Sequence, residues 1–367
     1  MSETAGGLRE ALAGLPDPRA RRGVRHRLTV VVTAAVCAVV AGYRSYAAIA
    51  EWVADVPAPT ALALGMTPDR RPSEAMIRRL LQAMDPQLLT AAIGVWLAGR
   101  TTAATPQAIA VDGKALRGSR TPDTPARHVM AACDQATGVV LGSIDVDGKT
   151  NEITRFAPLL DQLADLRNTV ITADALHCQR EHVTYLAQRG AHWILTVKGN
   201  QPHLHAQLTA LPWRAVPDAT RDTDRGHGRR EIRSCKILSI STGIDFPNAA
   251  QAIQIRRRRR RLDQPKRFAT ETVYAITDLR VHQAKPAQLA AWIRGHWSIE
   301  NKVHWVRDVT YDEDRSQIRT GTGPEVMAAL RNAAIGALRL TGVTNIAAAN
   351  RHHARDSTRP LALLGIT

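Results

Sequence analysis

Aromatic side chains are scarce in this sequence of 367 residues, at 4% of the total. Carbohydrate-binding surfaces and large protein interfaces rely on aromatic residues, so the composition argues against both. Cysteine is also rare, and Cys37, Cys133, Cys178 and Cys235 lie far apart without any C-x-x-C pair. We therefore expect four reduced thiols, and the sequence predicts neither a disulfide framework nor a zinc site.

Long apolar runs are missing as well. The run from Leu28 to Val40 follows several arginines and imitates a secretion signal, but the basic part starts late. The run is also shorter than the roughly 20 residues that a membrane-spanning helix needs, so we expect a buried core helix. No G-x-x-x-x-G-K-[ST] loop and no G-x-S-x-G elbow occur. The sequence therefore predicts a cytoplasmic protein with no membrane contact and no nucleotide cofactor.

Positive charge is plentiful, because 49 Lys and Arg against 33 Asp and Glu give a formal net charge of +16. Residues 221–271 hold 14 of the basic and 6 of the acidic residues, and so contribute half of the excess. They include the six consecutive arginines Arg256 to Arg261. This charge indicates a polyanionic partner, and we interpret the arginine run as a track for phosphates that does not read base sequence. On a strand, half of these arginines face solvent whatever their role.

The hydrophobic fraction of 44% is ample for packed cores, and the pattern along the chain predicts its domains. Residues 1–100 have Ala and Leu at helical spacing, with Ser73 as a helix N-cap, and predict a helical N-terminal domain. We expect a second domain over 105–345, with a β-rich insertion at about 205–280, and a C-terminal tail over 346–367.

The second domain has the pattern of an α/β fold. Strands are predicted at 108–111, 129–133, 139–146, 169–172 and 192–197, with helices at 150–166 and 179–188. Three strands, a helix and then alternation is the order of a ribonuclease H-like mixed sheet with helices on both faces. The insertion is predicted to contain strands at 231–240, 250–257 and 271–276, and long helices are predicted at 286–307 and 324–340.

Two carboxylates follow apolar strands of this sheet. Asp112 ends Ala-Ile-Ala-Val, and Asp174 follows Thr-Val-Ile-Thr-Ala. Either alone is an ordinary turn residue, and we interpret the similar Asp147-Gly148-Lys149 as a hairpin turn without chemistry. The first and fourth strands, however, should lie side by side at the centre of the sheet, which places Asp112 and Asp174 at one edge.

A third carboxylate, Glu300, lies in a segment with three of the seven tryptophans. At helical spacing His296, Trp297, Glu300, His304 and Arg307 share one face, which suits DNA ends near a metal. An ordinary surface stripe is the alternative explanation. Four further carboxylates compete for the role of third ligand: Asp308, Asp312, Glu313 and Asp314.

Several segments resemble the signature blocks of DDE transposases, in the bacterial insertion-sequence group that includes H-repeat-associated proteins. These segments are Val111–Ser119, Lys149–Ile153, Thr172–Gln179, Lys198–Gln201, Gly226–Arg233 and Arg294–Asn301. Leu15–Arg19, Arg22-Gly23 and Arg71–Ser73 resemble the associated N-terminal domain of that group, which is expected to bind DNA. The wider superfamily has Tyr, Arg and Lys at offsets −7, −4 and +7 from its glutamate, where this chain has Ile293, His296 and Arg307.

The resemblance implies that Asp112, Asp174 and Glu300 are the catalytic, metal-binding triad. Three carboxylates favour two Mg²⁺ or Mn²⁺ ions, with Asp112 expected to bridge them. Residues near the triad are expected to contact DNA: Lys114, Arg117, Lys198, Asn200, Arg294, His296, Trp297, Lys302 and Arg307. Solvated loop residues and a packed tryptophan are the alternatives for several of them.

The implied function is transposition. The enzyme would bind the terminal inverted repeats of its element, cut their ends by metal-dependent hydrolysis, and join the freed 3′-OH ends to target DNA. Its partner would be double-stranded DNA. The protein would bind this DNA as a homodimer, at the nucleoid. A catalytically inactive DNA-binding relative and a metal-dependent DNA nuclease are the alternatives.

Overall fold

The computed structural model describes residues 6–22, 24–101, 107–146, 152–226, 228–264 and 267–366. The chain splits into two compact units. The first comprises residues 1–104, 113–163 and 298–367, and the second comprises residues 105–112 and 164–297. The turn predicted at Asp147-Gly148-Lys149, most of the Lys149–Ile153 segment, and His227 lie outside the described residues.

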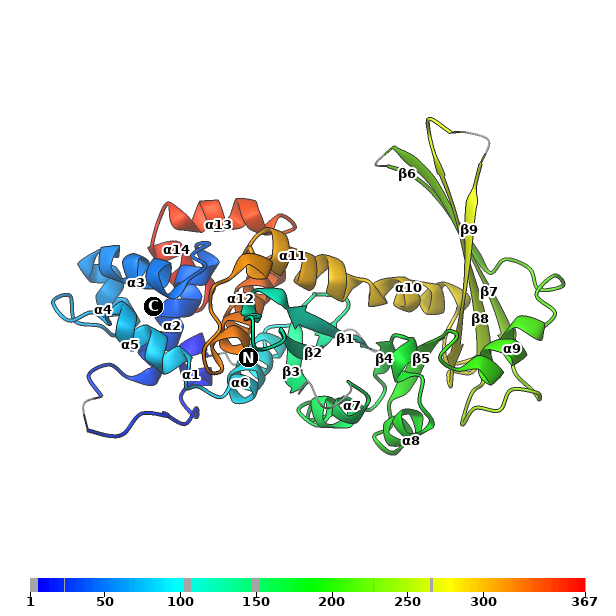
Figure 1. Cartoon of the computed structure of the whole chain (residues 1–367), viewed down its shortest axis with the longest axis horizontal. Coiled ribbons are helices and arrows are strands. Elements are labelled where there is room, and N and C mark those ends of the chain that lie inside the picture. The colour runs from blue at the N-terminus through cyan, green and yellow to red at the C-terminus, as the bar shows by residue number, and fades with distance from the viewer. Residues whose placement is uncertain are drawn as a thin grey trace, which may run out of the picture. The chain divides into compact units, whose positions relative to one another are not determined.

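The first unit is built mainly from helices (Figure 1). They are α1 (Leu8–Ala11), α2 (Leu28–Val40), α3 (Tyr46–Asp55), α4 (Ala58–Leu64), α5 (Glu74–Leu81), α6 (Pro86–Ala98), α7 (Glu152–Leu160), α11 (Trp305–Val309), α12 (Gly323–Leu340), α13 (Ile346–Ala354) and α14 (Thr358–Leu363). Helix α2 is apolar on all sides, and every residue of it except Thr29 is buried, as a helix at the centre of a core must be. The predicted buried core helix is thereby confirmed. No helix among the described residues is both long and apolar enough to cross a membrane.

Helices from both ends of the chain share one hydrophobic core in this unit. Helix α12 packs against α2 and α6, and Ile346 of α13 and Leu361 of α14 are buried in the same core. The segment predicted as a C-terminal tail is therefore folded into the first unit. Ser73 occupies the N-cap position of α5 as predicted, although its side chain accepts no capping hydrogen bond. The predicted domain boundaries stay predictions.

The strands form a nine-stranded mixed sheet in the order β3-β2-β1-β4-β5-β9-β8-β7-β6. They are β1 (Ala108–Leu116), β2 (Arg127–Asp134), β3 (Val140–Val146), β4 (Val170–Ala173), β5 (His192–Val197), β6 (Thr220–Gly226), β7 (Arg229–Ser239), β8 (Gln251–Arg261) and β9 (Ala269–Thr277). Strands β1, β4 and β5 are parallel, and the paired strands β2–β3 and β5–β9–β8–β7–β6 are antiparallel. The first and fourth strands pair directly, as the sequence predicts.

Strand β1 is longer than predicted. It continues through Asp112 to Leu116, so Asp112 lies within the strand and not at its end. A Cβ at position 113 would lie 2.5 Å from Nε2 of His128, so any side chain there would displace the ion pair of His128 with Glu152. The residues up to Asp112 belong to the second unit, and Gly113 begins the stretch that belongs to the first.

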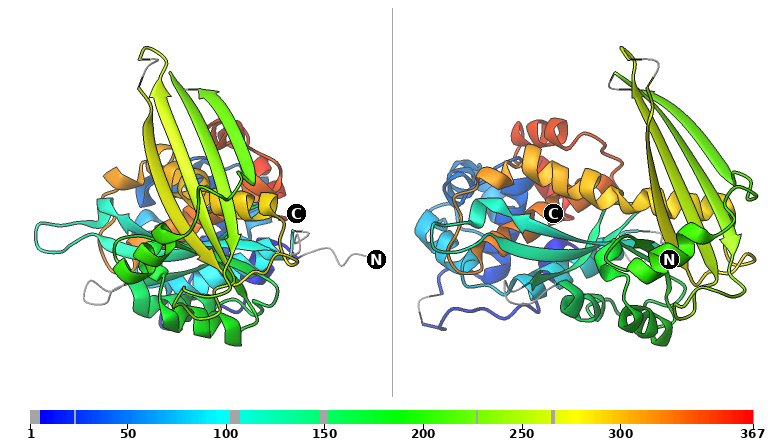
Figure 2. Two further views of the ribbon diagram at one scale, coloured as in Figure 1. Left: turned by 90° about the vertical axis from the view of Figure 1, so that its right-hand side faces the viewer. Right: turned by 45° about the vertical axis from the view of Figure 1, so that its right-hand side comes forward.

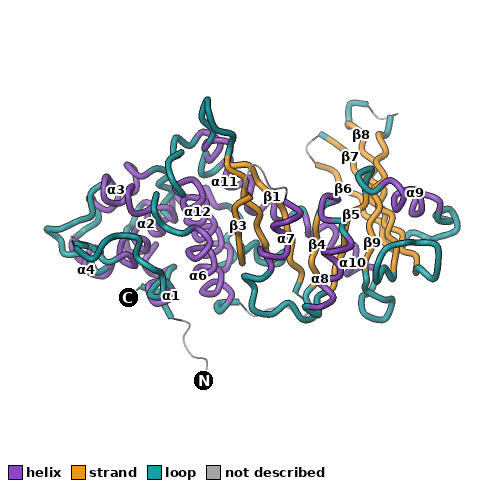
Figure 3. The backbone as a smooth tube through the Cα atoms, turned by 60° about the horizontal axis from the view of Figure 1, so that its bottom comes forward, coloured by secondary structure: helices purple, strands orange, loops and turns teal. Residues whose placement is uncertain are grey.

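The second unit contains the long strands β6–β9, which run side by side in Figure 2. Its helices are α8 (Arg180–Gln188), α9 (Pro202–Ala210) and α10 (Pro286–His296). Figure 3 shows α8 beside β4 and β5, and α10 packs against β4 and β6. Strand β6 and helix α9 were not predicted: β6 is polar and exposed at the edge of the sheet, so it has no apolar alternation.

The helix predicted at 286–307 is not continuous. Helix α10 ends at His296, Trp297 is in a turn, and residues Glu300–His304 form a π-helical segment, η3, before α11 begins. The one-face arrangement predicted from α-helical spacing therefore applies only to part of this segment. Single π-helical turns are rare in proteins, and those that occur are often found at functional sites.

Candidate active site

Asp112 and Asp174 lie next to each other along the sheet in the second unit. The parallel register pairs Val111 with Ala173, so each aspartate is the residue that follows a paired position. Both side chains are half-buried. Because the two strands run in the same direction, the residues that follow a paired position lie level with each other. The two carboxylates therefore occupy equivalent positions on neighbouring strands. The predicted juxtaposition of the two aspartates is confirmed by this register.

The loop after Asp174 is fixed by hydrogen bonds. Asp174 caps the short 3₁₀ helix η2 (Ala175–His177), and its carboxylate accepts from the backbone N–H of Leu176 at 2.9 Å. The side chain of Asn200 donates to the carbonyl of Ala175 at 2.6 Å, and that of Gln201 donates to the carbonyl of Cys178 at 2.8 Å. In the structure Asn200, a predicted DNA contact, holds the Asp174 loop in place.

Glu300 begins the π-helical segment of the first unit. Its side chain is about half exposed, and Oε2 lies 3.0 Å from Nδ1 of buried His304. The hydrogen bond with His304 is the largest influence on the pKa of Glu300 and lowers it, helped by the charges of Lys114 and Arg117, while burial opposes the shift. The carboxylate is therefore ionised and oriented, as a metal ligand has to be.

Asp112 sits at the covalent junction with Gly113, where β1 passes into the first unit. Asp112 carries a carboxylate that can act as a metal ligand, and in the first unit Glu300 and His304 carry two further groups of that kind. Two carboxylates are hard oxygen donors, and a histidine bonded to one of them is typical of the residues that orient a metal ligand. His304 was predicted on the face of Glu300 but not as part of the site, although its i,i+4 spacing was the available signal.

The rival carboxylates are occupied by other contacts in the first unit. Glu313 is buried and accepts hydrogen bonds from Arg307 and Arg331. Asp308 forms an ion pair with Lys114 at 2.6 Å, and burial raises the pKa of Asp308 although this pair opposes the shift. Asp314 lies 3.4 Å from Arg117. These contacts favour Glu300 over the rival carboxylates as the third ligand.

Three predicted DNA-contacting cations have structural partners. Arg307 has a side chain only 2% exposed and is paired with Glu313, which argues against its expected contact with DNA. Lys114 is 10% exposed. The ammonium of Lys302 donates to the carbonyls of Gln135 and Ala136 in the turn between β2 and β3. Burial or backbone bonding thus gives each of these cations a role in holding the fold.

The other predicted contacts differ in accessibility. Arg117 is 77% exposed in the first unit, and Lys198 is exposed directly after β5 in the second. Trp297 is 64% exposed. Nδ1 of His296 lies 3.1 Å from Oγ1 of Thr172, and burial lowers the pKa of His296 to about 4 although Asp174 opposes the shift. A neutral imidazole is a poor phosphate ligand, which argues against the expected grip of His296 on phosphate.

Comparisons with known proteins place these features in a family context. Residues 103–336 match the family model described as the transposase DDE domain, and residues 9–97 match the model described as associated with it. The chain is 28% identical over 350 residues to the "Putative transposase YncI" of Escherichia coli O157:H7, covering 90% of this chain and 87% of the relative. It is also 28% identical over 344 residues to the "H repeat-associated putative transposase YhhI" of Escherichia coli K12, covering 90% of both chains.

The chain also shows similarity to a solved structure. That structure is the piggyBac transposase synaptic complex with hairpin DNA, at 12% sequence identity and a TM-score of 0.43, covering 97% of this chain and 75% of that chain.

Proposed function

This chain belongs to the transposase DDE domain family, and from that premise we propose that it is the active transposase of a bacterial insertion sequence. It binds the terminal inverted repeats of its element, cuts the DNA ends and joins the 3′-OH ends to target DNA. The observation that carries the proposal is the placement of Asp112 beside Asp174 on neighbouring parallel strands of the sheet. We assign the catalytic fold to the ribonuclease H-like type, which the order β3-β2-β1-β4-β5 supports.

Asp112, Asp174 and Glu300 are the proposed ligands of two Mg²⁺ or Mn²⁺ ions. Carboxylate oxygens are the donors that these ions prefer, and the donor set contains no thiolate. When bound, such a pair of ions activates the attacking oxygen and stabilises the leaving oxygen of a phosphodiester. His304 orients Glu300 through the 3.0 Å hydrogen bond, and Asn200 holds the loop that carries Asp174.

The exposed Arg117, Lys198 and Trp297 are proposed to contact the DNA, Trp297 by stacking on a base. Arg294 is exposed but bonded to Asp222, so a phosphate would have to compete with that carboxylate. We propose that the protein acts on DNA in the bacterial cytoplasm as a homodimer, since two element ends must be processed together.

The test is DNA cleavage by single variants. Asp112→Asn, Asp174→Asn and Glu300→Gln should each lower the rate of Mg²⁺-dependent cleavage of terminal-repeat DNA by about 1,000-fold, because the metals contribute several kcal/mol to the transition state. Binding of the same DNA in EDTA should change by less than about threefold.

Asp314→Asn is the matched control, since it neutralises a neighbouring carboxylate that the proposal leaves out of the site. It should cleave at close to the wild-type rate. Full cleavage by any one of the three triad variants would overturn the assignment of that residue.

A further inference from the structure

The four strands β6–β9 form an antiparallel ribbon whose two faces differ in charge. In an antiparallel pair, residues opposite each other lie on the same face. The register pairs Arg225 with Arg230, Arg230 with Arg260, and Ile232 with Arg258 without a shift along the ribbon. One face, which we call the arginine face, therefore carries Arg221, Arg225, Arg230, Arg256, Arg258 and Arg260.

The four strands place no carboxylate on the arginine face. Its remaining positions beside the arginines are Thr223, Ile232, Ser234, Thr270 and Thr272. The guanidinium groups of Arg258 and Arg260 both lie over the ring of Phe268, at 4.7 and 5.1 Å from its centroid, which agrees with a shared face. From outside the strands, Asp218 lies 3.9 Å from Arg221.

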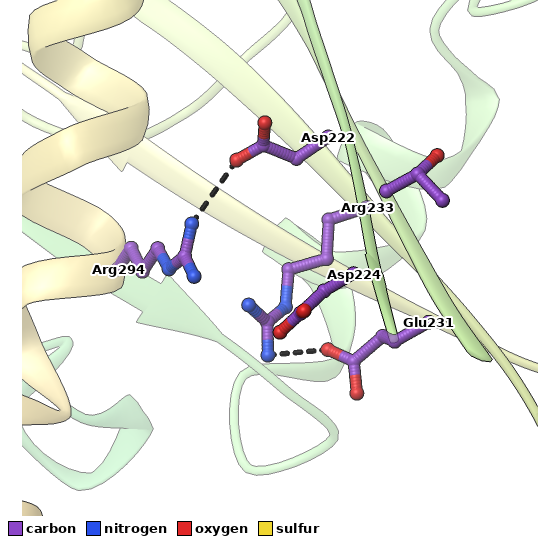
Figure 4. Close-up of a pocket in the computed structure, with 6 residues that line it drawn as sticks. Asp222, Asp224, Glu231, Arg233 and Arg294 are labelled. Carbon is purple, nitrogen blue, oxygen red and sulfur yellow. Dashed lines mark hydrogen bonds and ion pairs between the residues drawn. The ribbon is translucent and has the colours of Figure 1, made fainter. Parts of the chain in front are cut away.

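The opposite face, which we call the acidic face, carries all four carboxylates of these strands. They are Asp222, Asp224, Glu231 and Glu271. Two of them are paired with arginines of their own face: Arg257 and Arg233 bond Glu231, and Arg259 lies 3.5 Å from Glu271. Figure 4 shows Arg233 directed at Glu231, and it also shows Arg294 of α10 directed at Asp222.

This pairing divides the run Arg256–Arg261 into two sets. Burial raises the pKa of Glu231, but the hydrogen bond from Arg257 and the charges of Arg233, Arg257 and Arg259 outweigh it and lower the pKa overall. The odd-numbered arginines therefore share their face with the carboxylates of these strands. The even-numbered arginines share a face with further arginines, so the positive potential of the ribbon is concentrated there.

We propose that the arginine face binds the phosphate backbone of duplex DNA without reading its sequence, and that the acidic face stays off the DNA. The inference rests on the proposed function and adds which surface holds the substrate. Alternate residues on a strand recur about every 6.6 Å, so β8 presents its three arginines of this face at that spacing. The neighbouring strands β7 and β6 add one and two more arginines to the same face. Arginine forks match phosphate geometry, and phosphate contacts position a protein without specifying sequence.

The experiment compares two triple variants with the same loss of charge on the same strand. Arg256→Gln, Arg258→Gln and Arg260→Gln are combined in one protein, and Arg257→Gln, Arg259→Gln and Arg261→Gln in the other. The dissociation constant for a random-sequence duplex is measured in EDTA over a series of salt concentrations. The logarithm of the association constant falls linearly with the logarithm of the salt concentration, and we call the steepness of this fall the slope. Each lost phosphate contact lowers the slope by about 0.9.

The even-numbered variant should lower that slope by about 2 to 3, equally for random and terminal-repeat duplexes. The odd-numbered variant should change it by less than about 1. Equal slopes for the two variants, or a larger loss in the odd-numbered one, would overturn the proposal, as would a loss confined to the terminal repeat.

A second pair of variants covers the case in which β8 cannot tolerate three substitutions. Arg221→Gln with Arg225→Gln acts on the arginine face of the exposed edge strand β6, and Asp222→Asn with Asp224→Asn acts on its acidic face. The first pair should lower the slope by about 2, and the second should not lower it. Because binding is measured in EDTA, failed cleavage by the wild type would count against the proposed function and leave this result standing.

Discussion

Arg307 and Glu313 form the centre of a buried ionic network in the first unit. Glu313 accepts from Nε and Nη2 of Arg307 and from Arg331 of α12, and the three side chains are only 2–3% exposed. Helical spacing from Glu300 predicted that Arg307 would reach DNA. The spacing identified the neighbours of Arg307 on its own helix. Its partner Glu313 lies beyond that helix, in the 3₁₀ turn Glu313–Arg315, and also binds Arg331 of α12, a contact that helical spacing does not predict.

Breaking this network should destabilise the protein strongly. Glu313→Gln leaves two buried guanidinium groups without their carboxylate, so we expect the free energy of unfolding to fall by about 3–5 kcal/mol in urea titrations. Glu74→Gln, which breaks the exposed pair with Arg78 in α5, is the control and should cost less than about 1 kcal/mol. A comparable loss in both variants would show that the network adds nothing beyond a surface pair.

The residues of the candidate site were predictable to different degrees. Glu300 and His304 are four residues apart, so their contact follows from local helical spacing even through a π-helical turn. Asp112 and Asp174 required the order of strands in the sheet, which the apolar runs supplied. The ion pair of Lys114 with Asp308 joins residues 194 positions apart, and such a partner cannot be read from either segment alone.

Among the elements, apolar strands and helices were predicted more reliably than polar ones. Strand β5 is found at the predicted residues His192–Val197, because it is a short apolar run bounded by turns. Strand β6 is exposed at almost every position and is specified by its pairing with β7, so its sequence has no alternation to detect. The interruption of the helix after His296 was not predicted, because no proline occurs between His296 and His304 to mark it.

The end of β9 is tied to the start of β5 by a titratable pair. Oδ2 of Asp278 lies 2.8 Å from Nδ1 of His192, and this hydrogen bond raises the pKa of His192 although burial opposes the shift. The folded-state pKa thus lies above the unfolded value of about 6.5, so the stabilisation is complete below that pH and is lost as the pH rises through the folded-state pKa.

Thermal unfolding should reveal this pair. The melting temperature of the wild type, relative to that of His192→Gln, should be highest at about pH 6 and should decline toward about pH 8. Asp278→Asn should remove most of that pH dependence. A difference between wild type and His192→Gln that is constant over this range would contradict the assignment to His192.

For the molecule as a whole, the net charge of +16 is not spread evenly. The ribbon strands β6–β9 pair their carboxylates with arginines on one face and gather arginines without strand carboxylates on the other. Composition could indicate a polyanionic partner, but which arginines serve it depends on strand register. The proposed function assigns DNA as a substrate in addition to a bound partner, through the three carboxylates Asp112, Asp174 and Glu300.

The central claim is tested most directly by end joining. Wild-type protein, Mg²⁺, a duplex that carries one end of its own element, and a target plasmid are incubated together, and the DNA is sequenced across any new junction. The account predicts a free 3′-OH at the element's end and a covalent bond between that end and the target, both lost in Glu300→Gln. Tight binding of the end with neither cutting nor joining, in Mg²⁺ and in Mn²⁺, would contradict it.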